Sequence, residues 1–349
     1  MATLERVLLV DYVKTLDEYS PYPHTNKKVM TDYLKSDSTF RKSHEVALVN
    51  GKPMFSIQLD EEPEDRVWRS YLEELLLSPY VDATLQESVD AVQLVAEKSD
   101  LEVRTLPFHV SDDVHSDDLS SLGFWVEDHA TIFSTDEDKI CNVKLKSKQR
   151  NEVKNAKASF LDAVGGVINN IDLNPYRQED HTKLRRIIGD QALYWRGRDG
   201  VLSYELDYAV RLWLWVEACW KNGFAHVHVL TDAIGDYITA VGMVEIKPGV
   251  YVYTAYAQTS AHPKLTGAGV TSLVEFFKYA GPNNLYHLST SSDAFTDFSY
   301  MTYKKHVSNF RVPMVALAAI RKPTPKTKPP FYSLKSGGWV IDTSEQAET

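Results

Sequence analysis

The spacing of apolar residues divides the second half of the chain into alternating helices and strands. A helical period predicts helices over residues 178–193, 204–221 and 269–280. Runs of β-branched and aromatic residues predict strands over residues 225–230, 237–246, 250–258, 285–289 and 312–320, with a further helix through Tyr303. Two helices, an antiparallel meander and a strand-helix-strand ending together indicate an α/β domain with a mixed sheet.

The first half opens with a predicted hairpin and continues with helices. Asn50-Gly51 separates Glu45–Val49 from Lys52–Ile57, and this dipeptide between two apolar runs is the strongest short hairpin signal. Apolar spacing then predicts helices over residues 64–78 and 83–99, followed by a strand over 101–109.

Two changes in composition predict the domain boundaries. Gly165-Gly166 and the polar stretch to Asn174-Pro175 separate the halves, so we expect an N-terminal domain over 1–170 and a second domain over 171–322. Four prolines (Pro323, Pro325, Pro329 and Pro330) predict that residues 323–349 form an extended, loosely attached tail. A length of 349 residues suits two domains of ordinary size.

Composition indicates an ordinary globular protein without a membrane span. Hydrophobic residues make up 43% of the chain, and the longest apolar run covers nine residues from Val312 to Ile320, well short of a membrane helix. The apolar patch Val7–Val10 has no basic region before it and no cleavage site after it. Two cysteines, Cys141 and Cys219, cannot make a disulfide framework. We therefore expect a cytoplasmic location.

Charge is distributed unevenly along the chain. Residues 1–140 hold 13 basic and 29 acidic residues, a net charge of -16, whereas residues 141–349 hold 25 and 19, a net charge of +6. The acidic front half would repel polyanions, and the mildly basic back half could attract a phosphate-bearing ligand through a local site.

The most basic stretch of the chain is a predicted helix over residues 144–157, with six basic residues against one acidic residue. Lys148, Arg150 and Lys154 are its candidate contacts for a phosphate-bearing substrate or other polyanion. A solvated helix face would have the same composition, and the sequence leaves both interpretations open.

A metal site is not expected. His226 and His228 lie two apart on one strand and so share a face, but no third ligand is evident. Four tryptophans (Trp195, Trp213, Trp215 and Trp220) indicate either a buried helix or the wall of a pocket, and core packing is the simpler interpretation.

A glycine-containing turn follows the strand that ends at Gln258. The segment Lys264-Leu265-Thr266-Gly267-Ala268-Gly269 leads directly into a predicted helix. Such a turn leaves backbone N–H groups at the helix N-terminus, where they can bind a pyrophosphate.

This turn resembles the Gln/Arg-x-x-Gly-x-Gly/Ala loop of the GNAT acyltransferases, which holds the pyrophosphate of acyl-CoA. Lys264 occupies the first position of the loop and keeps its positive charge. The segment Asp297–Lys304 is similar to the GNAT segment whose tyrosine faces the thiol leaving group. The resemblance implies an acyl-CoA donor.

A second resemblance connects the two halves. Leu122-Gly123-Phe124-Trp125, followed by a strand and Leu145–Lys157, is similar to a stretch of the FemABX-like aminoacyltransferases and of the lysyl-phosphatidylglycerol synthase catalytic region. Those proteins are two GNAT-like domains in tandem, and Tyr303-Lys304 stands where they have a Phe-Lys pair. The resemblance implies a tandem GNAT-like fold, a site in the cleft between the domains, and aminoacyl-tRNA as an alternative donor.

The same resemblance and the chemistry of acyl transfer suggest roles for four residues. Lys304 is the candidate for stabilising the tetrahedral oxyanion. Tyr303 or Tyr300 could protonate the leaving group, and Glu245 could take a proton from an attacking ammonium. Each has an alternative structural role, such as helix packing for Tyr303 and a solvated strand end for Glu245.

The sequence therefore predicts an acyl or aminoacyl transferase whose acceptor is the amine or hydroxyl of a small molecule or a macromolecule. One alternative is an enzyme that modifies a base in DNA or RNA, using the basic helix and a cluster of arginines (Arg185, Arg186, Arg196 and Arg198). The other alternative is a catalytically inactive GNAT-like binding module.

Overall fold

A computed structural model describes most of the chain. The described residues are 2–36, 44–59, 66, 68–70, 85–99, 101, 103–104, 108–109, 125–128, 132–134, 147–196, 203–247, 250–259, 265–280, 285–288, 310–312, 314–319, 331–335 and 338–342.

Eight of the described strands form the first sheet. They are β1 (Leu4–Leu8), β2 (His44–Val49), β3 (Lys52–Gln58), β4 (Trp68–Ser70), β5 (Val103–Arg104), β6 (Phe108–His109), β7 (Trp125–Asp128) and β15 (Met314–Ala319). Their order is β1-β2-β3-β4-β5-β15-β6, and β7 also pairs with β15. Helix α4 (Leu85–Ser99) covers this sheet, where Val92 and Val95 pack against Trp68 in one buried cluster.

Seven described strands form the second sheet. They are β8 (Ile132–Ser134), β9 (Asn169–Asp172), β10 (Ala225–Thr231), β11 (Tyr237–Lys247), β12 (Val250–Gln258), β13 (Leu285–Leu288) and β14 (Phe310–Val312). Their order is β14-β8-β13-β12-β11-β10-β9. The β10-β11-β12 meander is antiparallel, whereas β12 and β13 run parallel, so the sheet is mixed as the sequence predicts.

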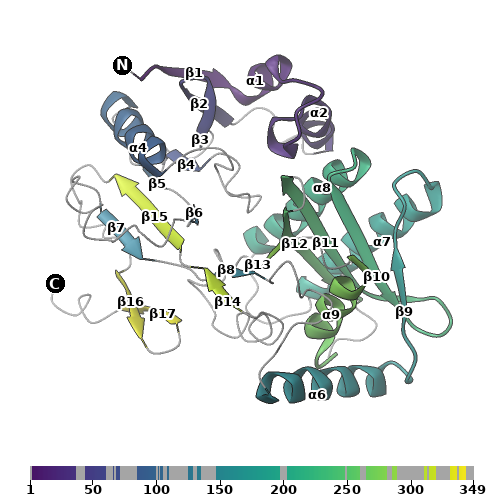
Figure 1. Cartoon of the computed structure of the whole chain (residues 1–349). Coiled ribbons are helices and arrows are strands. Elements are labelled where there is room, and N and C mark those ends of the chain that lie inside the picture. The colour runs from purple at the N-terminus through teal and green to yellow at the C-terminus, as the bar shows by residue number, and fades with distance from the viewer. Residues whose placement is uncertain are drawn as a thin grey trace.

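Helices cover both faces of the second sheet because its central strands bury alternate residues on each side. Ala240 and Val244 of β11 belong to the core that contains α8 (Ser203–Lys221) and α7 (Gln178–Arg196). Val241 and Met243 belong instead to the cluster under α9 (Ala268–Ala280). Helix α6 (Ser147–Ala163) lies beside α9, as Figure 1 shows at the bottom of the molecule.

The N-terminal helices join the two halves. Helix α1 (Leu9–Thr15), the short η1 (Pro23–Thr25) and α2 (Lys27–Ser36) pack near α8, and Figure 1 shows α2 beside it. The rings of Tyr33 and Trp215 meet edge to face with their centroids 5.3 Å apart. Asn222 donates a hydrogen bond to Asp32 over 3.0 Å. One continuous core therefore runs from the first 36 residues into the second sheet.

Most predicted elements of the second half are confirmed, but one prediction in the first half is wrong. The helix expected over 64–78 is contradicted at Trp68–Ser70, which form β4 and pair with β3 and β5. Trp68 is fully buried there, and its burial under α4 favours the strand over the local helical pattern. Within the expected tail, β16 (Phe331–Lys335) and β17 (Gly338–Asp342) form an antiparallel hairpin that is a sheet of its own among the described strands.

Each sheet contains elements from both sides of the domain boundary expected at residue 170. Strand β8 and helix α6 precede that residue but pack with the second sheet. Strand β15 lies near the end of the chain but pairs with β5, β6 and β7 of the first sheet. The division into 1–170, 171–322 and 323–349 stays a prediction about independent units. Among the helices of the described ranges, none is long and apolar enough to cross a membrane.

Candidate functional site

The turn before α9 is held in place by apolar anchors. Leu265 and Ala268 are buried and pack with Phe160 of α6 and Ile238 of β11. Gly267 adopts φ +81°, and its carbonyl accepts a hydrogen bond from the Thr271 N–H over 2.9 Å. The turn therefore has a fixed geometry before any ligand binds.

The first turn of α9 offers backbone donors. A helix leaves its first N–H groups without intrahelical acceptors, and those of Gly269 and Val270 have no backbone acceptor within the described part of the chain. The N-terminus of a helix attracts anions through these groups and through the helix dipole. Thr266 is exposed at this point, so the turn faces solvent.

Gly267 also has a packing reason to be glycine. A Cβ atom at this position would lie 2.2 Å from the carbonyl oxygen of Ala156 in α6, far inside van der Waals contact. The backbone of α6 thus touches the turn directly. The structure brings together the described parts of two segments, residues 144–157 and 264–269, that the sequence analysis chose separately for phosphate binding.

The three basic residues chosen on α6 point away from its buried face. Val153, Ala156 and Phe160 pack into the protein, whereas Lys148, Arg150 and Lys154 are exposed. Arg150 donates to Ser147 Oγ over 3.2 Å, and Lys148 lies 4.0 Å from Glu152 while 88% exposed. These are weak surface contacts, so the side chains remain available to a ligand.

Another lysine fixes α6 to α9. Lys157 Nζ lies 2.5 Å from Glu275 Oε1, and Lys278 contacts the same oxygen at 2.9 Å. Burial raises the pKa of Glu275, but hydrogen bonds from both lysines outweigh burial and leave the pKa below its ordinary value. The ion pair fixes α6 to the middle of α9.

Strands β12 and β13 separate after a short parallel pairing. Their register covers Val250–Val252 opposite Leu285–His287, while β12 continues to Gln258. Strand β13 pairs with β12 along one edge and, through His287 and Leu288, with β8 along the other. Its described register with β12 ends at Val252, and β12 continues from there toward the turn that starts α9.

A bulge accompanies this separation. Between the Gly242–Ala255 and Met243–Tyr253 pairs, Thr254 is the extra residue on β12. Its hydroxyl donates to the carbonyl of Val252 over 3.0 Å. A bulge bends its strand and increases the local twist, which agrees with the divergence of β12 from β13.

No family model matches this sequence, and no curated protein matches it. Solved structures do. A conserved protein of unknown function from Bacteroides thetaiotaomicron aligns with a TM-score of 0.57 at 9% identity, over 92% of this chain and 100% of that one. L-PGS from Bacillus licheniformis aligns with a TM-score of 0.52 at 12% identity, over 89% and 96% of the two chains.

A third structure is the C-terminal domain of a protein assigned as a lysylphosphatidylglycerol synthetase from Agrobacterium fabrum. It aligns with a TM-score of 0.51 at 9% identity, over 89% of this chain and 91% of that domain. The chain has a tandem GNAT-like fold. Sequence identities this low show a shared fold and nothing more. The mixed α/β architecture predicted from the sequence is confirmed.

Within the GNAT-like fold, the predicted phosphate-binding segment lies partly inside the described structure. Leu265, Thr266, Gly267, Ala268 and Gly269 form the turn and the first residues of α9. Lys264 lies outside the described residues. So do three of the four residues chosen for acyl transfer: Tyr300, Tyr303 and Lys304.

Glu245 lies far from the turn. It is half-buried on β11 opposite Tyr251, and its N–H donates to the carbonyl of Phe224 over 2.7 Å. The α9 turn follows the other end of β12, where Thr239 pairs with Gln258. Six residues of strand separate the two pairs, a distance of about 20 Å.

The histidine pair serves packing. His226 and His228 both contact the ring of Phe276 in α9, and His226 Nδ1 lies 3.6 Å from Asp172 Oδ2. Burial lowers the pKa of His228 to about 4, although Asp172 opposes the shift. Across the described ranges, no group of three or more His, Cys, Asp or Glu residues could hold a metal ion.

The tryptophans are core residues, as the simpler interpretation held. Trp213, Trp215 and Trp220 are fully buried on α8. A Cβ at Gly242 would meet the side chains of Val216 and Trp213 at 2.9 and 3.3 Å, so β11 approaches α8 closely beside the bulge. The side chain of Trp195 lies outside the described part.

Sequence reasoning missed a polar cluster at the end of β12. Asp190 of α7 accepts hydrogen bonds from the Tyr237 hydroxyl over 3.0 Å and from the Thr259 hydroxyl over 3.3 Å. The Arg186 guanidinium lies 4.9 Å from the centre of the Tyr237 ring. Thr259 begins the segment that leads to α9. The cluster joins residues far apart in sequence, and no local pattern could have revealed it.

Proposed function

We propose that this protein is an acyl or aminoacyl transferase that moves an acyl group from acyl-CoA or aminoacyl-tRNA to an amine or hydroxyl. The observation that carries the proposal is the turn that starts α9, where Gly267 at φ +81° and the exposed Thr266 lead into a helix N-terminus. The tandem GNAT-like fold supports it as a fold-level likeness. The acceptor could be a small molecule or a macromolecule, including tRNA or modified DNA.

The geometry supports one orientation for the donor. Its phosphates would lie against the N–H groups at the start of α9, and its extended arm would run along β12 toward the bulge at Thr254. The pantetheine arm of CoA carries two amides that can hydrogen-bond to strand backbone, which favours acyl-CoA.

The charged groups near the turn have proposed roles in binding. Lys264 would neutralise phosphate charge beside the turn. Arg150 and Lys154 on α6, with Lys148 on its other flank, would supply further cations for a donor larger than the turn can hold. All three α6 residues are exposed and paired only weakly or within their own helix.

The proposed chemistry is acyl transfer through a tetrahedral intermediate. Lys304 would stabilise its oxyanion, a contribution of about 3 kcal/mol for a well-placed donor. Tyr303 or Tyr300 would protonate the leaving thiolate of acyl-CoA or the leaving alkoxide of aminoacyl-tRNA. Glu245 remains the proposed base, which requires a donor that reaches about 20 Å along β12 from its phosphates at the turn.

A charge placed beside the turn tests the proposal. Thr266→Glu adds a carboxylate where the phosphates would lie, and the helix dipole tolerates an acidic residue at this end, so the fold should persist. The affinity for acetyl-CoA or aminoacyl-tRNA, measured by titration calorimetry, should fall by roughly tenfold to a hundredfold. Gln178→Glu adds the same charge at the exposed first residue of α7 and serves as the control.

The outcomes separate the proposal from its rivals. Unchanged affinity in folded Thr266→Glu would show that the donor does not bind at this turn. Donor binding without transfer to any amine or hydroxyl would favour the inactive binding module. Arg185 pairs with Glu217 at 2.8 Å and Arg186 stacks on Tyr237, so two arginines of the nucleic-acid alternative already have protein partners.

A further inference from the structure

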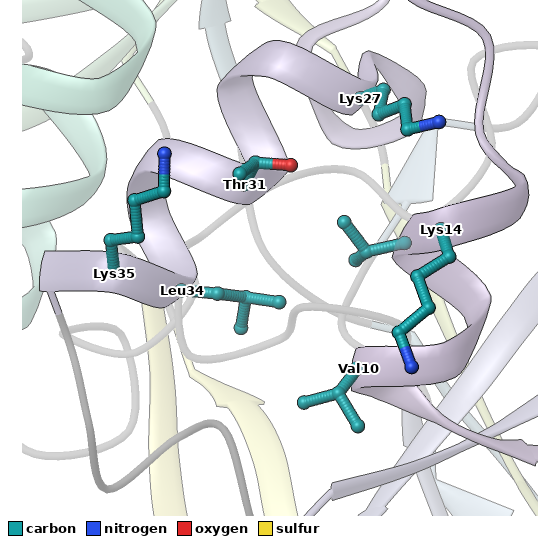
Figure 2. A pocket seen from close by; sticks show the side chains of 7 residues that line it. Val10, Lys14, Lys27, Thr31, Leu34 and Lys35 are labelled. Carbon is teal, nitrogen blue, oxygen red and sulfur yellow. The ribbon is translucent and has the colours of Figure 1, made fainter.

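A groove lies between the two N-terminal helices, far in sequence from the proposed transfer site. It has a volume of about 310 Å³ and is lined by residues of α1 and α2: Val10, Val13, Lys14, Lys27, Thr31, Leu34 and Lys35. The α2 residues recur at helical spacing, so they form one stripe along that helix. Figure 2 shows this stripe facing α1.

The groove has an apolar floor and a cationic rim. Val10, Val13 and Leu34 supply the floor. Figure 2 shows Lys35 on one side of the floor and Lys14 with Lys27 on the other. A ligand lying in the groove would therefore meet positive charge on both sides of an apolar surface.

The rim lysines can be recruited by a ligand. Lys14 contacts Asp11 at 2.6 Å and Lys35 contacts Asp32 at 3.8 Å, and each pair lies three residues apart on its own helix. The lysine side chains are 74% and 66% exposed. Exposed ion pairs of this kind contribute little to stability. Replacing the Asp partner of each lysine by a carboxylate of a ligand therefore costs little free energy.

We propose that this groove docks an acidic amphipathic helix of another protein. Apolar side chains one turn apart on that helix would fill the floor, and flanking Glu or Asp residues would pair with lysines on each side. The charge complementarity is local, because residues 1–140 carry a net charge of -16. Screening over about 8 Å at physiological salt limits the repulsion from distant carboxylates.

The arrangement favours a peptide over a lipid surface. A flat anionic membrane would be repelled by the net charge of -16 carried by residues 1–140, whereas a helix in the groove contacts only its floor and rim. Helix α2 also packs on α8 through its opposite face, where Tyr33 and Trp215 meet. A bound helix would thus rest on an element already fixed between the two halves. This inference does not depend on the proposed transferase activity.

The test uses the full chain and a synthetic probe. The probe is a fluorescein-labelled peptide of about 15 residues, with leucines at i, i+3, i+4 and i+7 and glutamates on both flanks. A sister peptide carries lysines in place of the glutamates. Fluorescence anisotropy measures binding to wild type, to Lys14→Glu/Lys35→Glu, and to Lys28→Glu/Lys98→Glu, a control with the same charge change outside the groove.

We expect the glutamate peptide to bind saturably, and the groove variant to weaken its affinity about tenfold. The control variant should bind as the wild type does, and the lysine peptide should bind more weakly than the glutamate peptide. The proposal is overturned if the glutamate peptide does not bind, or if both double variants weaken it equally. Vesicles of phosphatidylcholine and phosphatidylserine that bind through the same lysines, and that the peptide cannot displace, would also overturn it.

Discussion

Gly267 has two physical reasons to be glycine, and both can be measured. Its φ of +81° disfavours any side chain, and a Cβ would clash with the backbone of Ala156. Gly235 offers a control with φ +89° and open space around it. We expect Gly235→Ala to cost about 1–2 kcal/mol of unfolding free energy from backbone strain alone, and Gly267→Ala about 2 kcal/mol more.

Chemical denaturation of both variants measures this difference. Equal losses would show that α6 moves aside at no cost, and that the contact with Ala156 does not fix the turn. A bulky residue at Gly267 is therefore a poor test of donor binding. A loss of affinity in such a variant could come either from displacement of α6 or from a blocked phosphate position.

His228 should make stability depend on pH. Burial is the main cause that lowers its pKa to about 4, from an ordinary value of 6.5. Between these values the unfolded chain binds a proton that the folded chain does not, so stability falls as pH drops below 6.5. Near pH 5 this residue alone should cost about 2 kcal/mol relative to pH 8.

Denaturation midpoints at several pH values test this expectation. His228→Gln should flatten the pH dependence between about pH 6.5 and pH 4, whereas His226→Gln, at the more exposed neighbour on the same strand, should preserve most of it. A wild-type slope in His228→Gln would mean that another group causes the acid sensitivity.

At the scale of elements, α6 presents its basic residues on different flanks. Arg150 and Lys154 lie one turn apart and share a side, whereas Lys148 lies on the other flank of the helix. If the donor contacts the side that carries the pair, Arg150→Gln/Lys154→Gln should weaken donor binding and flatten its salt dependence. Lys148→Gln should change affinity less.

Salt titrations of donor affinity distinguish the outcomes, and melting curves should barely change because all three side chains are exposed. Equal, negligible effects of both variants would leave α6 as a solvated helix whose role is to support the turn. Equal, strong effects would indicate a polyanion that wraps both flanks.

Local patterns predicted the elements that follow their own periodicity. The strand over 250–258 matches β12, and the helix over 204–221 matches α8 within one residue. The helix expected over 64–78 failed because Trp68 owes its conformation to packing under α4, which no local period encodes. Strand β1 and helices α1 and α2 were not predicted, because their burial depends on packing against β2 and α8, which are distant in sequence.

The candidate site was predictable only in its glycine turn. Gly267 and Gly269 after a strand gave a local signal, and the structure places them at the start of α9 as expected. The contact of α6 with the turn, the separation of β12 from β13 and the Asp190 cluster all join distant segments. Such pairings arise from tertiary packing, so single-sequence reasoning has no access to them.

At the scale of the whole molecule, the halves should not separate cleanly. A fragment of residues 171–349 lacks α6, which packs on α9, and β8, which pairs with β13 and β14. It also lacks α2, whose Tyr33 packs on Trp215. We expect this fragment to melt at a much lower temperature than the full chain, or without a cooperative transition.

Calorimetry of the fragment and of the full chain makes the comparison. A fragment that unfolds cooperatively at the full-length midpoint would contradict the shared core. Its independent stability would then support the division at residue 170 over the exchange of β8, α6 and β15 between the sheets.

Hydrogen-deuterium exchange of the full chain, with and without donor, tests the central claim most directly because it reports where the donor binds. Acetyl-CoA or aminoacyl-tRNA should slow exchange at the backbone amides of residues 265–271 and of β12 over 253–258. Thr266→Glu should remove the protection, and Gln178→Glu should retain it. Protection confined to other segments, or none with either donor at saturating concentration, would contradict the proposal that this protein is an acyl or aminoacyl transferase that binds its donor at the α9 turn.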